Sequence, residues 1–417
     1  MTKEVYIMNE HIPRPEHPRP QFCRSSWRSL NGKWDFTYVT DADSKETKSI
    51  NVPFCPESRL SGINDTGFIS SCSYFRTFTV SKDELEGRVF IRFGACDYEA
   101  EVLINEVCAG KHRGGYSSFA FEITRQLTLG VNSIRVLVND DTRSPLQASG
   151  KQSDRPESYG CMYTRTTGIW QTVWLEFTPQ NYIKSAKYTP LVSQGALLIQ
   201  ALCDAPDKTV LNAECSFDGR YTGAAQGCVY GGKCDLLLKP DELHLWQPGD
   251  GALYDLTLTM KDDTVGSYFG MRNVECRNGM MTVNGKRVFQ RLVLDQGFYP
   301  DGIYTAPDDS ALENDIKLSM DMGFNGARLH QKIFEERFLY HCDRLGYMVW
   351  GEYPNWGLDE SVPAAWADFL EEWTDTLERD FNHPAIVGWC PFNETSHDDE
   401  KKLVAFTADL TSKLDET

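Results

Sequence analysis

The chain has 417 residues, 41% of them hydrophobic, which is enough apolar material for roughly two to four domains. Its formal net charge of −18 argues against nucleic acid or an anionic membrane as a partner, because either would be repelled. The amino-terminal stretch lacks the apolar core of a signal peptide, and no later run is long enough to span a membrane.

Thirteen cysteines are scattered from Cys23 to Cys390, an odd number with no C-x-x-C pair. This usage favours reduced packing residues over disulfides or a zinc site, and it predicts a cytoplasmic protein. The eight histidines lack metal-ligand spacing, and His397-Asp398-Asp399 is more typical of a solvated helix start. There is also no glycine-rich phosphate-binding loop. The sequence therefore predicts neither a metal nor a cofactor.

Residues 1–180 have the pattern of an all-β region. The turn Asn31-Gly32 lies beside alternating aromatic residues and predicts a hairpin within residues 27–39. Further β-branched or aromatic runs are separated by turn residues, a spacing that suits a β-sandwich or jelly roll. The loop Lys111–Tyr116 carries polar and aromatic groups suited to a sugar, although a plain Gly-Gly turn explains its spacing at least as well. The further runs cover residues 73–80, 88–93, 101–104 and 133–138.

Residues 181–277 form a second β region of about 95 residues. Alternating runs at 196–201 and 253–260 are punctuated by proline and glycine, and the length suits an immunoglobulin-like sandwich. No chemistry stands out in this region. We expect it to be a spacer between accessory and catalytic domains.

From Asn278 to Thr417 the pattern changes to strands that alternate with helices. A hairpin around Asn284-Gly285 leads into four strand–helix units, and such alternation predicts parallel pairing. A (β/α)8 TIM barrel needs ~250 residues, and this region supplies about 140, so we expect the first half of a barrel. The expected strands cover 291–296, 325–329, 347–351 and 386–392, and the expected helices cover 308–322, 334–345, 364–381 and 400–414.

Polar residues follow each of these strands, at the end where barrel enzymes carry out their chemistry. The stretch Asn382–Glu394 is the clearest case, because a short buried strand there delivers a carboxylic acid. The strand-end residues are Asp295 and Gln296, then Arg328 and His330, then Trp350, Glu352, Asn355 and Trp356, and finally Asn393 and Glu394.

Each strand-end residue also has a purely structural interpretation. Arg328 could pair with a nearby acid as a bridge, Glu352 could be a satisfied buried carboxylate, and the tryptophans could belong to the core. Four consecutive strands that end in polar groups are less easily explained by packing alone.

Taken together, the ordered motifs resemble glycoside hydrolase family 2, the group of β-galactosidases, β-glucuronidases and β-mannosidases. The resemblance covers essentially the whole chain and implies a jelly roll, an immunoglobulin-like domain and a catalytic barrel, in that order. Single motifs are weak, but their order is specific. The matching stretches are Trp27 with Leu30–Phe36, Tyr74-Phe75-Arg76, Asn105 with Gly110–Tyr116 and Phe119, Leu245–Pro248 with Leu253-Tyr254, Gly270-Met271-Arg272, Val283–Lys286 and Asn382–Glu394.

The resemblance implies roles for the strand-end residues. Glu394 matches the general acid/base, and Asn393 matches the residue that hydrogen-bonds the sugar 2-hydroxyl. Arg328 and His330 resemble residues that line the site, and Glu352 resembles an acidic residue that supports it. Many members have Tyr-Pro after the histidine, whereas this chain has Gln331-Lys332. The place of Trp350 and Asn355 at the third strand end makes them further candidate substrate contacts.

The implied reaction is retaining hydrolysis of a β-glycoside, which needs two carboxyl groups ~5 to 5.5 Å apart. Glu394 would donate the proton, with its pKa raised by a pocket of Trp389, Phe392 and Trp350. The family's nucleophile is a glutamate after the seventh strand and is expected beyond Thr417. Glu352 is a stand-in only by proximity. The motifs do not specify the sugar.

Two alternatives stay open. The chain could be a non-catalytic carbohydrate-binding fragment that uses His112, Arg113 and Tyr116. It could also be one half of a split enzyme, whose obligate partner is a complementing C-terminal half. The two edge strands of a half barrel would be exposed, which predicts self-association or a homo-oligomer.

Overall fold

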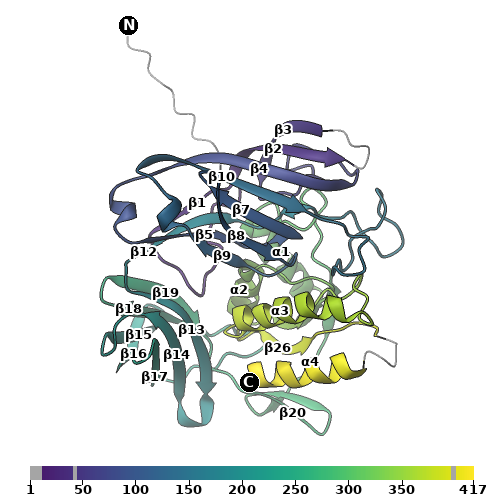
Figure 1. The fold of residues 1–417 in the computed structure, drawn as a ribbon. Coiled ribbons are helices and arrows are strands. Elements are labelled where there is room, and N and C mark those ends of the chain that lie inside the picture. Colours follow the sequence, from purple (N-terminus) through teal and green to yellow (C-terminus); the bar gives the residue numbers. More distant parts are fainter. Residues whose placement is uncertain (1–11, 41–44, 396–400) are drawn as a thin grey trace.

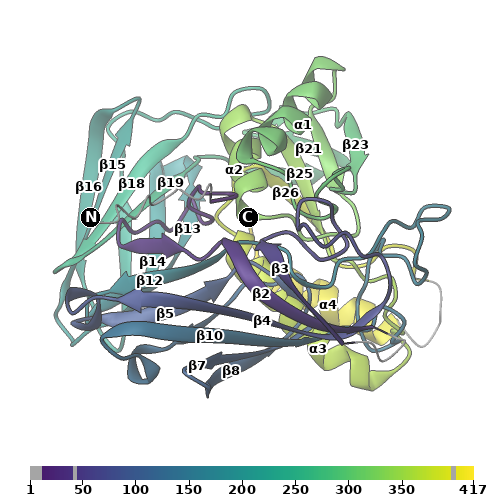
Figure 2. The ribbon, with the colours of Figure 1, turned by 90° about the horizontal axis from the view of Figure 1, so that it is seen from above.

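A computed structural model describes residues 12–40, 45–395 and 401–417. Three regions meet around a common centre, with the first across the top of Figure 1, the second at the lower left and the helices at the right. Figure 2 shows the same three groups from above. The expected helix start at His397-Asp398-Asp399 lies outside the described residues.

The first region consists mainly of two antiparallel sheets with a shared core. One sheet has the order β3-β2-β4-β10-β7-β8 and the other β1-β12-β5-β9, with a small β11-β6 pair beside them. Side chains from both large sheets, such as Trp34 and Ile91, are buried in one cluster. The strands are β1 (Trp27–Ser29), β2 (Gly32–Thr40), β3 (Lys45–Val52), β4 (Ile69–Val80), β5 (Arg88–Phe93), β6 (Cys96–Asp97), β7 (Glu99–Ile104), β8 (Val107–Arg113), β9 (Phe119–Glu122), β10 (Gly130–Asn139), β11 (Gly168–Ile169) and β12 (Val173–Thr178).

The hairpin expected at Asn31-Gly32 is wrong. Strand β1 pairs with β12, whereas β2 pairs with β3 and β4, so the turn carries the chain from one sheet to the other. The Asn31 side chain accepts a hydrogen bond from Val173 N at 3.1 Å and donates to Pro13 O at 3.1 Å. An Asn-Gly pair makes a turn, but the flanking runs form a hairpin only if each is the other's partner.

The second region packs a three-stranded sheet, β13-β14-β17, against a four-stranded sheet, β16-β15-β18-β19. Alternate residues of both sheets, including Ile199 and Leu256, fill its core. Phe22 from the amino-terminal segment joins this core. The strands are β13 (Tyr182–Leu191), β14 (Ala196–Asp204), β15 (Val210–Phe217), β16 (Arg220–Cys228), β17 (Lys233–Leu238), β18 (Tyr254–Met260) and β19 (Asp263–Phe269).

The third region contains the expected alternation of strands and helices. A small sheet includes the predicted Asn284-Gly285 hairpin, and four parallel strands follow in the order β23-β24-β25-β26. The strands are β20 (Val274–Arg277), β21 (Met280–Val283), β22 (Lys286–Arg287), β23 (Leu292–Asp295), β24 (Gly326–Leu329), β25 (Met348–Glu352) and β26 (Ile386–Cys390). The helices are α1 (Asp309–Asp321), α2 (Glu336–Leu345), α3 (Pro363–Asp380) and α4 (Lys401–Leu414). Short 3-10 turns in the first two regions cover Asp83–Leu85, Thr124–Gln126 and Val192–Gln194.

Helix α3 joins the parallel sheet to the first region. It carries an apolar stripe at intervals of four residues that is buried and includes Phe369 and Trp373. The Trp373 indole N–H donates to Thr411 Oγ1 of α4 at 2.9 Å, so the last two helices pack together. Such a stripe, repeated at fourfold intervals, is what holds a helix on a sheet.

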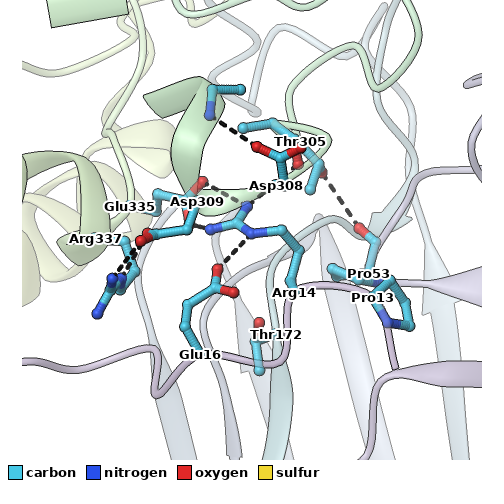
Figure 3. A network of polar contacts seen from close by, with 12 residues as sticks. Pro13, Arg14, Glu16, Pro53, Thr172, Thr305, Asp308, Asp309, Glu335 and Arg337 are labelled. Carbon is cyan, nitrogen blue, oxygen red and sulfur yellow. Dashed lines mark hydrogen bonds and ion pairs between the residues drawn. The ribbon is translucent and has the colours of Figure 1, made fainter. Parts of the chain in front are cut away.

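The amino-terminal segment ties the regions together. Arg14 reaches the third region, where its guanidinium contacts Glu335 at 2.6 Å, and it also contacts Glu16 of its own segment at 2.5 Å (Figure 3). Arg24 contacts Asp263 of the second region at 2.7 Å and forms a short ion pair with Glu176 of the first. Because these partners are buried or nearly so, the segment fixes how the three regions sit on one another.

Within the described ranges, no helix combines the length and apolarity needed to cross a bilayer. Across those same ranges, no group of three or more His, Cys, Asp or Glu side chains could hold a metal ion.

Candidate functional site

The carboxyl ends of β24, β25 and β26 bring several predicted residues together. Arg328 and Trp350 are register partners, and so are Glu352 and Cys390. The Arg328 Nη2 atom lies 3.4 Å from Cys390 Sγ, across the intervening strand. Arg328, Glu352 and Cys390 therefore share one face of the parallel sheet.

Glu352 is a fully buried carboxylate with both oxygens in use. Its Oε2 atom accepts a short hydrogen bond from Arg328 Nε, and its Oε1 atom accepts one from Gln331 N at 2.9 Å. The His330 Nδ1 atom lies 2.7 Å from Oε1 but is not aligned as a hydrogen-bond donor. Both oxygens of Glu352 are thus engaged by groups of the chain itself.

Asn393 is held from two sides. Its side-chain oxygen accepts from Arg328 Nη2 at 2.9 Å. Its main-chain N–H donates to Asn355 Oδ1 at 2.9 Å, and its carbonyl accepts from Asn355 Nδ2 at 3.2 Å and from Trp356 Nε1 at 3.3 Å. The residue before Glu394 is consequently fixed in both backbone and side chain.

Glu394 lies just beyond β26, exposed and with a φ of 57°. This left-handed conformation is unusual for a residue with a side chain and occurs where the surrounding structure enforces it. The expected apolar pocket around it is wrong in part. Trp389 meets Trp373 edge-on and Phe392 lies tilted against Phe369, so both rings face helix α3.

Trp350 remains on the site's face of the sheet. Its ring lies against Gly388 of the neighbouring strand, where a Cβ would come within 2.8 Å of the indole. Its indole N–H donates to Gln290 Oε1 at 2.8 Å. The ring is only partly buried and gives the site an apolar surface.

The sugar-binding loop expected at Lys111–Tyr116 is also wrong in its details. Lys111, His112 and Arg113 belong to strand β8 rather than to a loop. Tyr116 is 0% exposed, and its main-chain N–H donates to Glu372 Oε1 of α3 at 2.7 Å. The loop therefore docks on the helix and cannot present Tyr116 to a ligand.

A cavity of about 790 Å³ lies between the six-stranded sheet and α3, away from the strand ends. Its lining includes Lys111 and Arg113, but both cations are already paired. Lys111 contacts Glu101 at 3.1 Å, and Arg113 contacts Glu99 and Asp368, each at 3.0 Å. These charges are balanced within the chain itself.

Sequence reasoning missed Glu372 altogether. This buried acid also accepts from Ser117 N at 3.1 Å and from the Tyr353 hydroxyl at 2.8 Å. Burial raises the pKa of Glu372 to about 7. Its place among the charged residues of an amphipathic helix gave no indication that it faces inward.

In the sequence, Lys332 stands out only because Gln331-Lys332 replaces the Tyr-Pro pair of many family members. Its ammonium is buried and donates to Gly297 O at 2.5 Å and Tyr304 O at 2.8 Å. It also lies 4.6 Å from the Tyr304 ring centroid. Burial lowers the pKa of Lys332 to about 8.

The first half of the Asn382–Glu394 stretch has a docking role. Asn382 donates to Ala186 O at 2.8 Å and accepts from Tyr188 N at 2.7 Å, both on strand β13. Arg272 donates to the carbonyl of Pro384 at 2.8 Å. One end of β26 is thus attached to the second region, and the other end carries the candidate acid.

A parallel sheet with polar side chains at its carboxyl ends defines the class of α/β proteins whose chemistry lies at that edge. No protein-family model matches the chain. Curated relatives do match. They include a putative β-glucuronidase of Formosa agariphila (25% identical, 87% of this chain and 45% of the relative) and a β-galactosidase of Thermoanaerobacter pseudethanolicus (24% identical, 93% and 53%).

Solved structures match as well. A β-D-glucuronidase of Dictyoglomus thermophilum superposes with a TM-score of 0.78 at 20% identity, covering 96% of this chain and 72% of that one. A β-glucuronidase of Faecalibacterium prausnitzii gives 0.79 at 22% identity, covering 94% and 73%. These structures share the fold.

The chain is a homologue of bacterial β-glucuronidases and β-galactosidases, which confirms the resemblance to glycoside hydrolase family 2 drawn from its motifs. Its relatives are glycoside hydrolases. The chain spans about half the length of the first two curated relatives, 45% and 53% respectively.

Proposed function

We propose that the whole protein is a retaining exo-acting β-glycosidase in which Glu394 is the general acid/base. The observation that carries this proposal is that Asn393 is hydrogen-bonded both by Arg328, through its side chain, and by Asn355, through its main chain. It fixes the peptide that leads into an exposed carboxylate at a strand end, as an acid that must reach a glycosidic oxygen requires. The names of the relatives support the same reaction class.

In this proposal residues 1–180 are a jelly roll, 181–277 an immunoglobulin-like sandwich and 278–417 the first half of a TIM barrel. The sheet orders of the three regions are compatible with these folds. Asn393 would bind the sugar 2-hydroxyl through its side chain. Arg328, His330, Trp350, Glu352 and Asn355 would shape and support the site around it.

The retaining mechanism sets a further requirement. While Glu394 protonates the leaving oxygen, a second carboxylate ~5 to 5.5 Å away attacks the anomeric carbon. Glu352 does not fit that role, because Arg328 and Gln331 N occupy both of its oxygens. We assign the nucleophile to a carboxylate of the whole protein outside the described residues.

The compartment and partners follow from the same reasoning. We propose a cytoplasmic protein, because its thirteen cysteines are free, and a carbohydrate as the substrate. Strands β23 and β26 are edges of the parallel sheet, which suits either self-association or pairing with a complementing half.

The experiment is hydrolysis of aryl β-galactoside, β-glucuronide and β-mannoside by the whole protein. Replacing Glu394 by Gln should reduce kcat/KM by orders of magnitude for a poor leaving group. The loss should be much smaller for an activated aryl leaving group, which departs without a proton. Equal losses on both substrates would remove Glu394 from the acid role, and inactivity of the wild-type protein on the whole panel would refute the proposed reaction.

A further inference from the structure

Gln331 is a buried residue that links the end of β24 to the end of β25. It follows β24, is 1% exposed and has a φ of 55°. Its main-chain N–H donates to Glu352 at 2.9 Å. Its side-chain Nε2 donates to Asn355 Oδ1 at 2.9 Å, and its Oε1 accepts from Trp356 N at 3.1 Å. Every polar contact of this side chain therefore leads toward the end of β25.

The orientation of both carboxamides is dictated by main-chain donors. Trp356 N can only donate, so the Gln331 atom that faces it must be oxygen, and Nε2 must face Asn355. Asn393 N can also only donate, so the Asn355 atom that faces it must be oxygen. The sequence of donors and acceptors from Trp356 to Asn393 has a single consistent assignment.

The Asn355 carboxamide has no unused hydrogen-bond donor or acceptor position. Its oxygen accepts from both Gln331 Nε2 and Asn393 N, each at 2.9 Å. Its amide group donates to Glu360 Oε1 at 2.6 Å and to Asn393 O at 3.2 Å. A carboxamide offers two acceptor and two donor positions, and all four are filled. A change at Gln331 must consequently be felt at Asn393, one residue before Glu394.

The backbone of Gln331 is held against its own preference. A left-handed conformation is unfavourable for a residue that carries a side chain. The first region takes part in holding it, because Gly150 packs so closely that a Cβ there would come within 2.4 Å of the Gln331 carbonyl. The observed conformation directs the N–H to Glu352 and the carboxamide to Asn355.

We propose that Gln331 is a positioning residue for the acid Glu394, acting through Asn355 and Asn393. This inference rests on the proposed glycosidase function and deepens it. Gln331 touches neither the substrate nor the reacting atoms. Its task is to keep the Asn393 peptide in the one orientation that presents the Glu394 carboxyl to the leaving oxygen.

The most informative substitution is Gln331→Glu, because the two side chains have nearly the same shape. A carboxylate keeps the acceptor for Trp356 N but places a second oxygen against Asn355 Oδ1, which already accepts from Asn393 N. Asn355 must then turn or move, and Asn393 loses its anchor. We expect kcat/KM for an alkyl or benzyl glycoside to fall by about 10²-fold, as for a misplaced catalytic group, with less than about 5-fold loss on an activated aryl glycoside.

Gln152→Glu is the matched control. Gln152 is also 1% exposed, accepts from Thr166 N at 2.7 Å and donates to Asp97 Oδ2 at 2.7 Å, but it lies within the first region. Its substitution should lower the thermal midpoint without changing the ratio of rates on the two substrates. If Gln331→Glu also leaves that ratio unchanged, the inference is wrong and Gln331 is only structural.

Gln331→Met provides a second variant without a new charge. It removes both carboxamide contacts and should shift the substrate ratio in the same direction. Amide hydrogen exchange over residues 386–394 should quicken in this variant, since Asn393 N is no longer anchored by a fixed Asn355. Unchanged exchange would contradict the inference. A wild-type protein inactive on every glycoside refutes the proposed function instead, and the two failures are thus distinguishable.

Discussion

Arg328 on β24 and Glu352 on β25 form an ion pair that joins two strand ends and leaves neither side chain free. Glu352 is fully buried, whereas the Arg328 side chain is 33% exposed and continues to Asn393 Oδ1 at 2.9 Å. The pair therefore orients the guanidinium toward the candidate site. Its value is geometric, since exposure of Arg328 to water weakens the electrostatic attraction.

Glu352→Gln should disturb this arrangement more than its small size suggests. Both Glu352 oxygens accept from groups that can only donate, so the new amide must point its NH2 at another donor. We expect the free energy of unfolding to fall by about 2 kcal/mol. We also expect kcat/KM to fall by the same factor on activated and on poor substrates. Thermal unfolding and the two-substrate assay measure these effects. Glu394→Gln is the control, because an exposed carboxylate should leave the thermal midpoint unchanged.

The stability of the chain should fall as the pH rises from the unfolded pKa of a glutamate, ~4.3, toward about 7, in part because of Glu372. Burial raises the pKa of this acid to about 7, whereas an unfolded glutamate titrates near ~4.3. Its contribution is fully present below the unfolded pKa and is lost as the pH rises through the folded pKa.

Glu372→Gln imitates the protonated acid and can keep the contacts to Tyr116 N and Tyr353. Relative to this variant, the wild type should lose about 2 kcal/mol between pH 5 and 8. Thermal midpoints of both proteins across that range test the prediction. A difference that does not change with pH would contradict it.

The buried pair of Asp343 and His383 should stabilise the chain without affecting the acid. The two side chains meet at 2.6 Å, and both are 0% exposed. Burial alone pushes the pKa of His383 down, but the Asp343 carboxylate outweighs it and the pKa is raised. The pair's contribution is thus complete below pH ~6.5 and is lost as the pH rises through the folded pKa.

Asp343→Asn should cost about 3 kcal/mol at pH 5.5 and progressively less at higher pH. Because His383 precedes β26 and Glu394 follows it, the ratio of rates on poor and activated substrates should stay at the wild-type value. Denaturation at several pH values, together with the two-substrate assay, gives both readouts. A shifted ratio would show that the two ends of β26 are coupled.

The edge strand β23 should make this chain self-associate. Leu294 on this strand is 51% exposed, and Leu318 on α1 is 49% exposed. Unpaired strand edges with apolar side chains invite pairing with another chain. Sedimentation should show association that weakens in Leu294→Lys, with Leu129→Lys in the loop before β10 as an exposed control that changes little. A concentration-independent monomer would refute the prediction.

Much of the fold was accessible from sequence because its cues are local. The alternation of strands and helices after Asn278 follows from periodicity, and the Asn284-Gly285 hairpin forms between runs that are each other's partners. The same dipeptide at Asn31-Gly32 misled, since the partner of β1 is β12, far along the chain. Turn chemistry fixes a change of direction but not the identity of the pairing strand.

The candidate site was predictable only at the level of residue type and strand end. Arg328, Glu352, Asn355 and Asn393 are brought together as their positions suggested. The side on which Trp389 lies could not be deduced, because a strand covered on both faces is apolar throughout. The role of Gln331 could not be predicted either, since it depends on which hydrogen-bond donors surround the side chain in the fold and not on the residue type.

Strand β26 is five residues long and anchored at both ends. Asn382 is bound to β13 of the second region, and Asn393 is bound to Asn355. Each strand residue spans ~3.3 Å, so one inserted residue would displace the acid by that distance and reverse the face it presents. The strand is therefore a spacer of fixed length. The second region, through its contacts with Asn382, therefore sets the position of the candidate acid at the other end of the strand.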